Sequence, residues 1–251
     1  MEKYFSINEQ KNSIQCKLYA NDARSFDNVI VCCHGFAGSK DSGFARKLAA
    51  KVLPSYKTTA LLTFDWPCHG SDRRPKLDLE GCDQYLQLVV DYVRNTMQPS
   101  RIFANGVSFG GYLLLKYLFE HGNPFERVVL RSPAVAMYES LTGPLMEQGD
   151  LEKLYKTKTL AVGFETKIKI TSAFVDELRQ NDITQWDFRP FADELLLIHG
   201  DRDEIVSFAT VNQFADDNDL LFLAVEGADH RFVDPVRMSE AVNNTVDFYE
   251  L

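Results

Sequence analysis

Short apolar runs alternate with helical patterns along most of the chain, and this alternation constrains the fold more than any other feature. Each run is brief and continuous, as expected for strands that are buried on both faces of a sheet. The runs lie at 29–33, 58–64, 101–105, 127–130, 195–198 and 220–225. Strands that alternate with helices predict an α/β fold, a mostly parallel central sheet with helices on both faces.

The start of the chain follows a different pattern. Ile14, Cys16 and Leu18 alternate with polar residues, as they would on one buried face of a strand. Together with residues 4–7 they predict an antiparallel hairpin at one edge of the sheet.

Helical spacing is clearest in two segments. Apolar residues between Cys82 and Val93 recur at i, i+3, i+4 and i+7, which predicts a helix with one buried face. Residues 109–120 are apolar on nearly all sides and predict a deeply buried helix that ends at His121 and Gly122. Residues 44–53 and 234–248 resemble surface helices.

One segment interrupts the alternation. Between residues 135 and 190 there is no clear strand–helix unit, although 167–170 is compatible with a short strand. An insertion of about 55 residues is too long for a plain loop. We therefore expect residues 135–190 to form a small cap insertion over the strand ends, with 1–134 and 191–251 as the core.

The segment NGVSFGG at 105–111 places Ser108 between a predicted strand and a predicted helix. Gly106 and Gly110 would remove the side chains that clash in a sharp turn, and the helix N-terminus would favour developing negative charge on the serine. These features indicate a nucleophile. The alternative is a tight strand-to-helix turn without chemistry.

A nucleophilic serine needs a histidine, and in this architecture the acid and then the histidine follow the serine. The chain has five histidines: His34, His69, His121, His199 and His230. Only His230, in the loop before the last helix, follows both the serine and an acid outside the predicted cap. Asp201 and Asp203, which follow the strand at 195–198, both qualify as the acid that orients the imidazole, and the residues alone do not separate them.

Composition narrows the possible partners and compartment. The formal net charge of -9 and the pI of about 5.1 argue against binding to nucleic acid or an anionic membrane. Five cysteines without a C-x-x-C pattern predict neither a disulfide framework nor a zinc site. No apolar leader or long apolar run occurs, so we expect a cytoplasmic protein without a signal peptide or membrane span.

Four motifs in order give the chain a resemblance to the α/β-hydrolase superfamily over essentially its whole length. They are HGFAG at 34–38, GVSFG at 106–110, HGDRD at 199–203 and GADHRF at 227–232. The resemblance implies that Asp203 is the acid, with Val206 completing HG-x-x-D-x-x-V, and that Asp201 shapes the loop. It also implies an oxyanion hole formed by the backbone N–H groups of Phe36 and Phe109. His34 and His69 are expected to support their loops.

Within the superfamily the motif series looks like small bacterial carboxylesterases, including cinnamoyl and feruloyl esterases; the peptidase-like members are also similar. We therefore expect a serine hydrolase that cleaves a carboxylic ester of a small or aromatic acyl group through an acyl-enzyme, with no metal or organic cofactor. The alternatives are a thioesterase, peptidase or acyltransferase on the same triad, or a catalytically idle ligand-binding fold. The expected partner is a small-molecule ester, and a homodimer is compatible with such a chain.

Aromatic and apolar residues of the predicted cap are candidates for the substrate pocket. They are Met137, Tyr138, Phe164 and Trp186. With Phe36 and Phe109 they would form an apolar lining for an acyl group. Packing inside the cap itself is the alternative for each of them.

Overall fold

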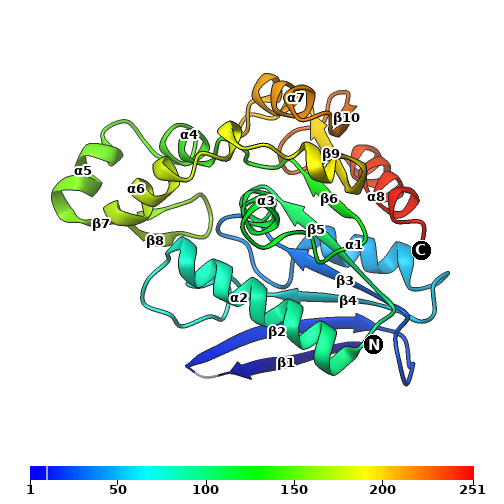
Figure 1. The fold of residues 1–251 in the computed structure, drawn as a ribbon. Coiled ribbons are helices and arrows are strands. Elements are labelled where there is room, and N and C mark those ends of the chain that lie inside the picture. The colour runs from blue at the N-terminus through cyan, green and yellow to red at the C-terminus, as the bar shows by residue number, and fades with distance from the viewer. Residues whose placement is uncertain (10) are drawn as a thin grey trace.

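A computed structural model describes residues 1–9 and 11–251 and contains an eight-stranded central sheet in the order β1-β2-β4-β3-β5-β6-β9-β10 (Figure 1). The strands of this sheet are β1 (Glu2–Glu9), β2 (Asn12–Ala20), β3 (Asn28–Cys33), β4 (Thr59–Phe64), β5 (Arg101–Val107), β6 (Val128–Arg131), β9 (Leu195–Gly200) and β10 (Leu221–Val225). β2 pairs antiparallel with β1 and with β4, and the remaining pairs are parallel. The predicted fold class and the hairpin at the sheet edge are both confirmed.

Helices cover both faces of the sheet. The helices of the two layers are α1 (Gly43–Val52) and α8 (Pro235–Tyr249) on one face, and α2 (Leu79–Tyr92), α3 (Phe109–His121) and α7 (Phe208–Asp217) on the other. Four of these helices match the predicted segments to within a few residues. α7 was not predicted, because its sequence FATVNQFADD carries only a short apolar stripe.

The apolar runs are continuous because each strand packs against a hydrophobic core on both faces of the sheet. In β3, Val29 and Val31 pack into the cluster beneath α2 and α3, whereas Ile30 packs into the cluster beneath α1 and α8. All three side chains are fully buried. A polar residue at any of these positions would therefore face an apolar layer, which explains the loss of simple alternation.

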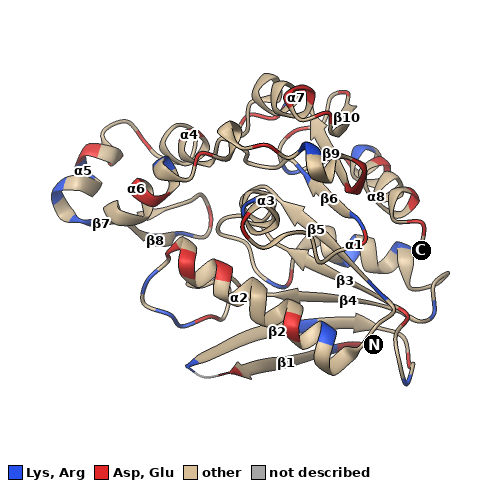
Figure 2. Cartoon of the chain, viewed as in Figure 1, with Lys and Arg blue, Asp and Glu red and all other residues tan. Residues whose placement is uncertain are grey.

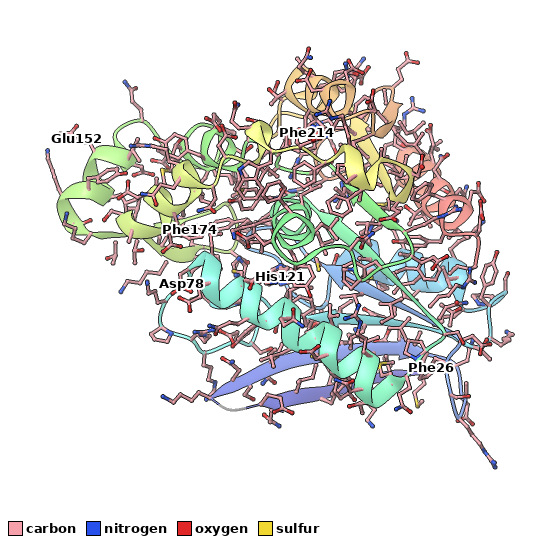
Figure 3. The ribbon with its side chains drawn as sticks, in the orientation of Figure 1. Phe26, Asp78, His121, Glu152, Phe174 and Phe214 are labelled. Atoms are coloured by element: carbon pink, nitrogen blue, oxygen red, sulfur yellow. The ribbon has the colours of Figure 1, made fainter. Side chains whose placement is uncertain are left out.

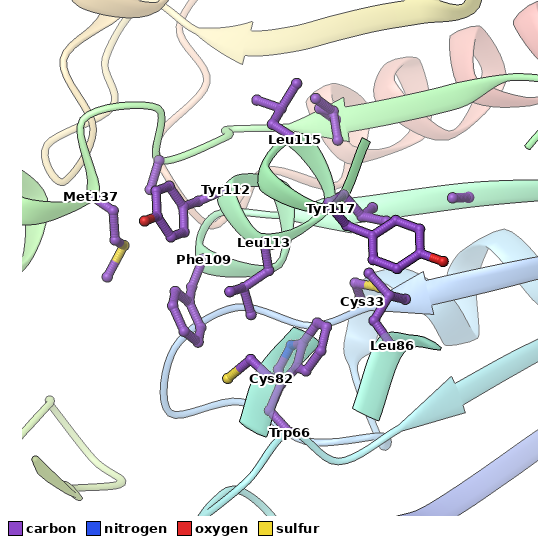
Figure 4. Packing of buried hydrophobic residues seen from close by; sticks show 14 of the residues in the cluster. Cys33, Trp66, Cys82, Leu86, Phe109, Tyr112, Leu113, Leu115, Tyr117 and Met137 are labelled. Carbon is purple, nitrogen blue, oxygen red and sulfur yellow. The ribbon is translucent and has the colours of Figure 1, made fainter. Parts of the chain in front are cut away.

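Helix α3 is buried on nearly all sides, as predicted. Residues 109–118 of this helix are buried without interruption. Figure 4 shows Phe109, Leu113 and Tyr117 directed towards Trp66 and Leu86, on the side of α3 that faces α2 and the sheet. The nucleophile candidate thus directly precedes a helix whose residues 109–118 are all buried.

Helix α2 begins at a side-chain cap and ends in a distorted turn. Asp78, labelled in Figure 3, accepts a hydrogen bond from the Gly81 N–H at 2.8 Å, which satisfies one of the free N–H groups of the first turn. At its other end α2 continues as a π-helical turn, η1 (Val93–Met97), which stops at Gln98 in the left-handed conformation.

Residues 135–190 add elements of their own beside the main sheet. They are α4 (Met137–Thr142), α5 (Asp150–Thr157), β7 (Thr159–Val162), β8 (Ile168–Thr171), α6 (Ser172–Gln180) and η2 (Ile183–Gln185), and the 3-10 helix η3 (Arg189–Glu194) then leads into β9. β7 and β8 form a separate antiparallel pair, so the short strand expected at 167–170 is present. Phe174 of α6, labelled in Figure 3, packs against Phe109 with a distance of 6.3 Å between the ring centroids. The assignment of this segment as a substrate-covering cap stays a prediction.

The strand order sets the position of the site. β3 lies between β4 and β5, so the chain leaves β3 towards one edge and later returns to its other side. Cys33, at the end of β3, pairs with Gly106 of β5. The loops that follow these two strands therefore meet at a topological switch point, where open α/β sheets bind ligands.

The surface carries charges of both signs. Figure 2 shows acidic and basic residues together on α5 and α8. Across residues 1–9 and 11–251, no helix has the length and apolarity needed to cross a membrane.

Candidate active site

Ser108 lies in a sharp turn between β5 and α3. Its backbone has φ 54° and ψ -116°, a conformation that residues with a side chain rarely adopt. A Cβ at Gly110 would overlap the backbone carbonyl oxygens of Cys33 and His34, so only glycine lets the start of α3 approach β3 this closely. The turn therefore lifts the Ser108 hydroxyl above the end of the sheet at a helix N-terminus.

Three side chains from distant loops form a continuous hydrogen-bonded chain at this point. The Nε2 atom of His230 lies 3.1 Å from the Ser108 Oγ, and the Nδ1 atom of His230 lies 2.8 Å from Asp203 Oδ2. The carboxylate fixes the tautomer with Nδ1 protonated, which leaves Nε2 free to accept the serine proton. The arrangement has the geometry of a nucleophile, a general base and an orienting acid.

Asp203 is held in place as an anion. Its side chain is buried, and Oδ1 accepts the N–H groups of Ile205 at 2.9 Å and Val206 at 2.7 Å. Burial alone would raise the pKa of Asp203, but the hydrogen bond to His230 and the Val206 N–H outweigh it, and the pKa lies below its ordinary value. The carboxylate can therefore stabilise an imidazolium on His230 without taking its proton.

Asp201, the other candidate acid, has a different contact. Its Oδ1 accepts the Gly227 N–H at 2.6 Å, which ties the loop after β9 to the loop that carries His230. The structure thus brings Asp203 to His230 and gives Asp201 the contact of a loop-shaping residue.

The two predicted oxyanion donors lie beside the serine. A Cβ on Gly35 would lie 3.3 Å from the Ser108 Cβ, so the loop that carries Phe36 runs directly past the nucleophile. Among the described residues, neither the Phe36 N–H nor the Phe109 N–H donates a hydrogen bond to the protein. The Phe36 and Phe109 rings meet edge to face at 5.9 Å. Two free N–H groups near a nucleophile are the donors that a tetrahedral oxyanion requires.

A buried ion pair anchors the loop that carries Phe36. The Lys40 Nζ lies 2.8 Å from Asp65 Oδ2, and Asp65 also accepts the backbone N–H groups of Lys40 and Ser71. Because both ions are buried and the carboxylate has several donors, breaking the pair would leave an uncompensated charge. This contact connects the loop after β3 to the loop after β4.

His34 and His69 support the same loop, as expected. Burial is the main cause that lowers the pKa of His34 to about 3 and the pKa of His69 to about 4, so both rings are neutral. The Trp66 N–H donates to His34 Nε2, and the His34 Nδ1–H faces the Gly35 carbonyl at 2.8 Å. The His69 ring packs edge to face against Phe36.

Two residues that the sequence analysis did not identify, Arg131 and Glu204, and one histidine that it set aside as the base, His199, also contact the site. Arg131, at the end of β6, donates from Nη1 to the His230 carbonyl at 2.7 Å, and the Glu204 carboxylate accepts the His230 N–H at 3.3 Å. The Nε2 atom of His199 is 3.3 Å from Asp203 Oδ2 and 3.1 Å from the Val206 carbonyl. Arg131 could have been found from its position directly after the apolar run at 127–130, because a buried arginine there needs a partner.

The predicted pocket residues separate into two groups. Phe164 lines a cavity of about 420 Å³ that also contains Phe36, Ser108 and His230. Met137 is buried in the core, and Tyr138 lines a different cavity, where Arg179 donates to its hydroxyl. Trp186 stacks on Phe119 with a centroid distance of 4.5 Å. Neither described cavity beside the serine is lined by Met137, Tyr138 or Trp186. These side chains pack within the protein instead.

Comparison with known families and structures agrees with the fold. A family model described as alpha/beta hydrolase fold matches residues 28–161. No curated protein sequence gives a significant match.

Similar solved structures extend over the whole chain. Est1E from Butyrivibrio proteoclasticus with bound ferulic acid is 18% identical, with a TM-score of 0.78 over 98% of this chain and 100% of that chain. A putative hydrolase from Agrobacterium vitis is 17% identical, with a TM-score of 0.77 over 99% and 98%. A monoacylglycerol lipase from Paleococcus ferrophilus is 17% identical, with a TM-score of 0.71 over 94% and 97%.

Proposed function

The chain belongs to the α/β-hydrolase fold family, and we propose that it is a serine hydrolase that cleaves carboxylic esters of small or aromatic acyl groups. The observation that carries the proposal is the hydrogen-bonded series Ser108–His230–Asp203, placed beside two unoccupied backbone N–H groups. A serine in a merely structural turn would need neither the buried carboxylate nor the oriented imidazole.

In the first step His230 Nε2 takes the proton of Ser108, and the Oγ attacks the ester carbonyl carbon. The carbonyl oxygen becomes an oxyanion that the N–H groups of Phe36 and Phe109 stabilise. The tetrahedral intermediate then collapses. Its carbon–oxygen bond to the alcohol breaks, and the alcohol leaves with the proton from His230, so that an acyl-enzyme on Ser108 remains.

In the second step a water molecule replaces the alcohol. His230 takes a proton from this water, and the hydroxide attacks the acyl carbon. The intermediate collapses again, Ser108 Oγ leaves with the proton, and the carboxylic acid is released. Asp203 stabilises the imidazolium in both steps and stays ionised throughout.

The dimensions of the site favour a small or aromatic acyl group. The cavity of about 420 Å³ beside Ser108 has an apolar lining that includes Phe36, Leu145, Phe164 and Ile205. This volume is in the lower range of small-ligand pockets. The solved structures with the same fold include a protein with ferulic acid bound and a monoacylglycerol lipase, and both names agree with ester chemistry.

The test is hydrolysis of p-nitrophenyl esters of increasing acyl length, and of methyl ferulate, by the wild type and by Ser108→Ala. We expect hydrolysis by the wild type that the variant loses, with the highest kcat/KM for short or aromatic acyl groups. Stoichiometric labelling of Ser108 by a fluorophosphonate, without hydrolysis of any ester, would redirect the assignment to thioesters, peptides or acyl transfer. Absence of both labelling and hydrolysis in a folded protein would favour an idle ligand-binding fold.

A further inference from the structure

Ser108 lines two cavities that differ in the charge of their lining residues. The smaller cavity, of about 280 Å³, has Ser108 and His230 in its wall together with three basic side chains, Lys47, Arg131 and Arg231. No carboxylate occurs among the described residues that line it. In a chain with a net charge of -9, such a cluster is a local departure from the average surface.

The larger cavity, which also has Ser108 and His230 in its wall, has the opposite character. Its charged lining includes two carboxylates, Glu204 and Asp229, and the remainder is mostly apolar. Arg231 borders both cavities. An anionic group would therefore be repelled from the larger cavity and attracted to the smaller one.

Two of the three basic side chains of the smaller cavity, Lys47 and Arg231, are available to a ligand. Within residues 1–9 and 11–251, Lys47 forms no ion pair. Arg231 forms an ion pair with Glu165 at 3.9 Å, and that carboxylate is 90% exposed. Arg131 is 5% exposed, and among the described residues its Nε has no acceptor. Lys47 and Arg231 therefore keep charge that a ligand can meet, whereas Arg131 already interacts with Asp203, Asp229 and the His230 carbonyl.

The N-terminus of α1 adds further donors to this wall. Ser42, Gly43 and Phe44 line the cavity, and Ser42 forms no side-chain cap. In the described part of the chain, the N–H groups of Gly43 and Phe44 have no protein acceptor. Free N–H groups and the helix dipole both favour an anion at this place.

We propose that this basic cavity binds an anionic group of the substrate, a carboxylate or a phosphate, while the apolar cavity takes the uncharged portion. The proposal rests on the proposed ester hydrolysis at Ser108 and specifies its substrate class: a small ester with an anionic group a few bonds from the scissile carbonyl. Lys47 and Arg231 are then the residues that determine specificity. Arg131 adds its charge from beneath while it holds the His230 carbonyl.

The experiment compares esters that differ in one charge. Phenyl butyrate is matched with 3-carboxyphenyl butyrate and with 3-(phosphonooxy)phenyl butyrate, which place the anion on the alcohol portion. p-Nitrophenyl butyrate is matched with the p-nitrophenyl monoester of glutaric acid, which places it on the acyl portion. The readout is the ratio of kcat/KM for the anionic ester to that for its neutral partner.

We expect the ratio to exceed one in at least one pair, and the pair identifies both the anion and its side of the ester. Lys47→Gln and Arg231→Gln should each lower this ratio about three- to fivefold, as expected for the loss of a partly exposed ion pair. The matched control is Lys51→Gln, one helical turn further along α1 and outside the cavity lining, which should leave the ratio unchanged. High salt should reduce the preference of the wild type.

The outcomes separate this inference from the proposed function. Hydrolysis of the neutral esters without preference for any anionic partner would overturn the inference and leave the esterase assignment intact. A preference that Lys47→Gln and Arg231→Gln do not change would also overturn it. Failure to hydrolyse all of the esters would overturn the proposed function and this inference with it.

Discussion

Arg131 Nη1 donates a hydrogen bond of 2.7 Å to the backbone carbonyl of His230, although the two residues are 99 positions apart. The guanidinium is stacked between the rings of Phe44 and Phe232 and is buried. Burial lowers the pKa of Arg131 to about 10, so the group stays charged at neutral pH. The contact connects the end of β6 to the loop that carries the proposed general base.

We expect Arg131→Met to lower kcat about tenfold, because a charge-assisted hydrogen bond contributes roughly 1.5–3 kcal/mol and here it fixes the loop of His230. KM for a neutral ester should change little. The matched control is Arg127→Met. Arg127 also donates to a backbone carbonyl and stacks on a ring, in this case Phe248, but lies at the other end of β6. Equal kcat losses in the two variants would exclude a specific role for Arg131.

Ser108→Ala and His230→Ala should each reduce kcat at least about 10⁴-fold, and the double variant should be scarcely worse. The reason is that the proton transfer and the attack form one event, which either substitution abolishes. Steady-state rates on p-nitrophenyl acetate check this expectation, with circular dichroism to confirm folding. Losses that multiply in the double variant would show that the two residues act independently.

Asp203→Asn should reduce kcat about 10³- to 10⁴-fold, because an amide cannot stabilise the imidazolium and favours the wrong tautomer of His230. Asp201→Asn is the control, since among the described residues Asp201 accepts only the Gly227 N–H and an amide oxygen can do the same. The kcat of Asp201→Asn should stay within about threefold of the wild type, because this substitution changes only the strength of one hydrogen bond. The reverse order of the two losses would assign the acid to Asp201.

Much of the sheet could be predicted because its strands are short and buried on both faces, and such strands leave continuous apolar runs. Ser108 and His230 could be located from their places after a strand and before a helix. The choice between Asp201 and Asp203 could not be made from the residues, because both follow the same strand and differ in their contacts, Asp203 with His230 and Asp201 with Gly227. The structure adds this distinction.

The pocket was harder to predict. Apolar and aromatic residues such as Met137, Tyr138 and Trp186 are typical of ligand pockets. Whether such a side chain faces a cavity or a neighbouring residue depends on packing between distant segments. Trp186, for example, stacks on Phe119 of α3. Arg131 was missed for a similar reason, since its partner is a backbone carbonyl that carries no sequence signal.

The buried imidazole of His69 should make the protein sensitive to acid. Its pKa is about 4 in the folded state, whereas an unfolded histidine has a pKa of about 6.5. The unfolded state therefore binds more protons below the unfolded value, and the free energy of unfolding falls as the pH drops from 6.5 towards 4. At pH 5 the free energy of unfolding should be about 2 kcal/mol lower than at neutral pH because of this residue.

His69→Asn tests this expectation, because the amide can replace the Nδ1–H that faces the Pro67 carbonyl at 2.8 Å and does not titrate. Urea unfolding at neutral pH and at pH 5 should show a loss in the variant that is about 2 kcal/mol smaller than in the wild type. Equal losses in the two proteins would contradict a neutral, buried His69.

The backbone of Ser108 should store strain. At φ 54° and ψ -116° a Cβ is unfavourable, so Ser108→Gly should be about 1 kcal/mol more stable than Ser108→Ala, even after the entropic cost of glycine. Thermal unfolding of both inactive variants measures the difference without a contribution from catalysis. A glycine variant less stable than the alanine variant would show that the turn is not strained.

The strand order described above also determines when the protein can become active during folding. Ser108 and His230 are separated by 122 positions, and the sheet between their strands includes the pairing of β6 with β9, which are not consecutive strands in the chain. Such non-local pairing forms slowly, because chain entropy is lost before the contacts are gained. Recovery of ester hydrolysis after refolding therefore reports when the last long-range contacts form. It should be slower than recovery of the helical circular dichroism signal.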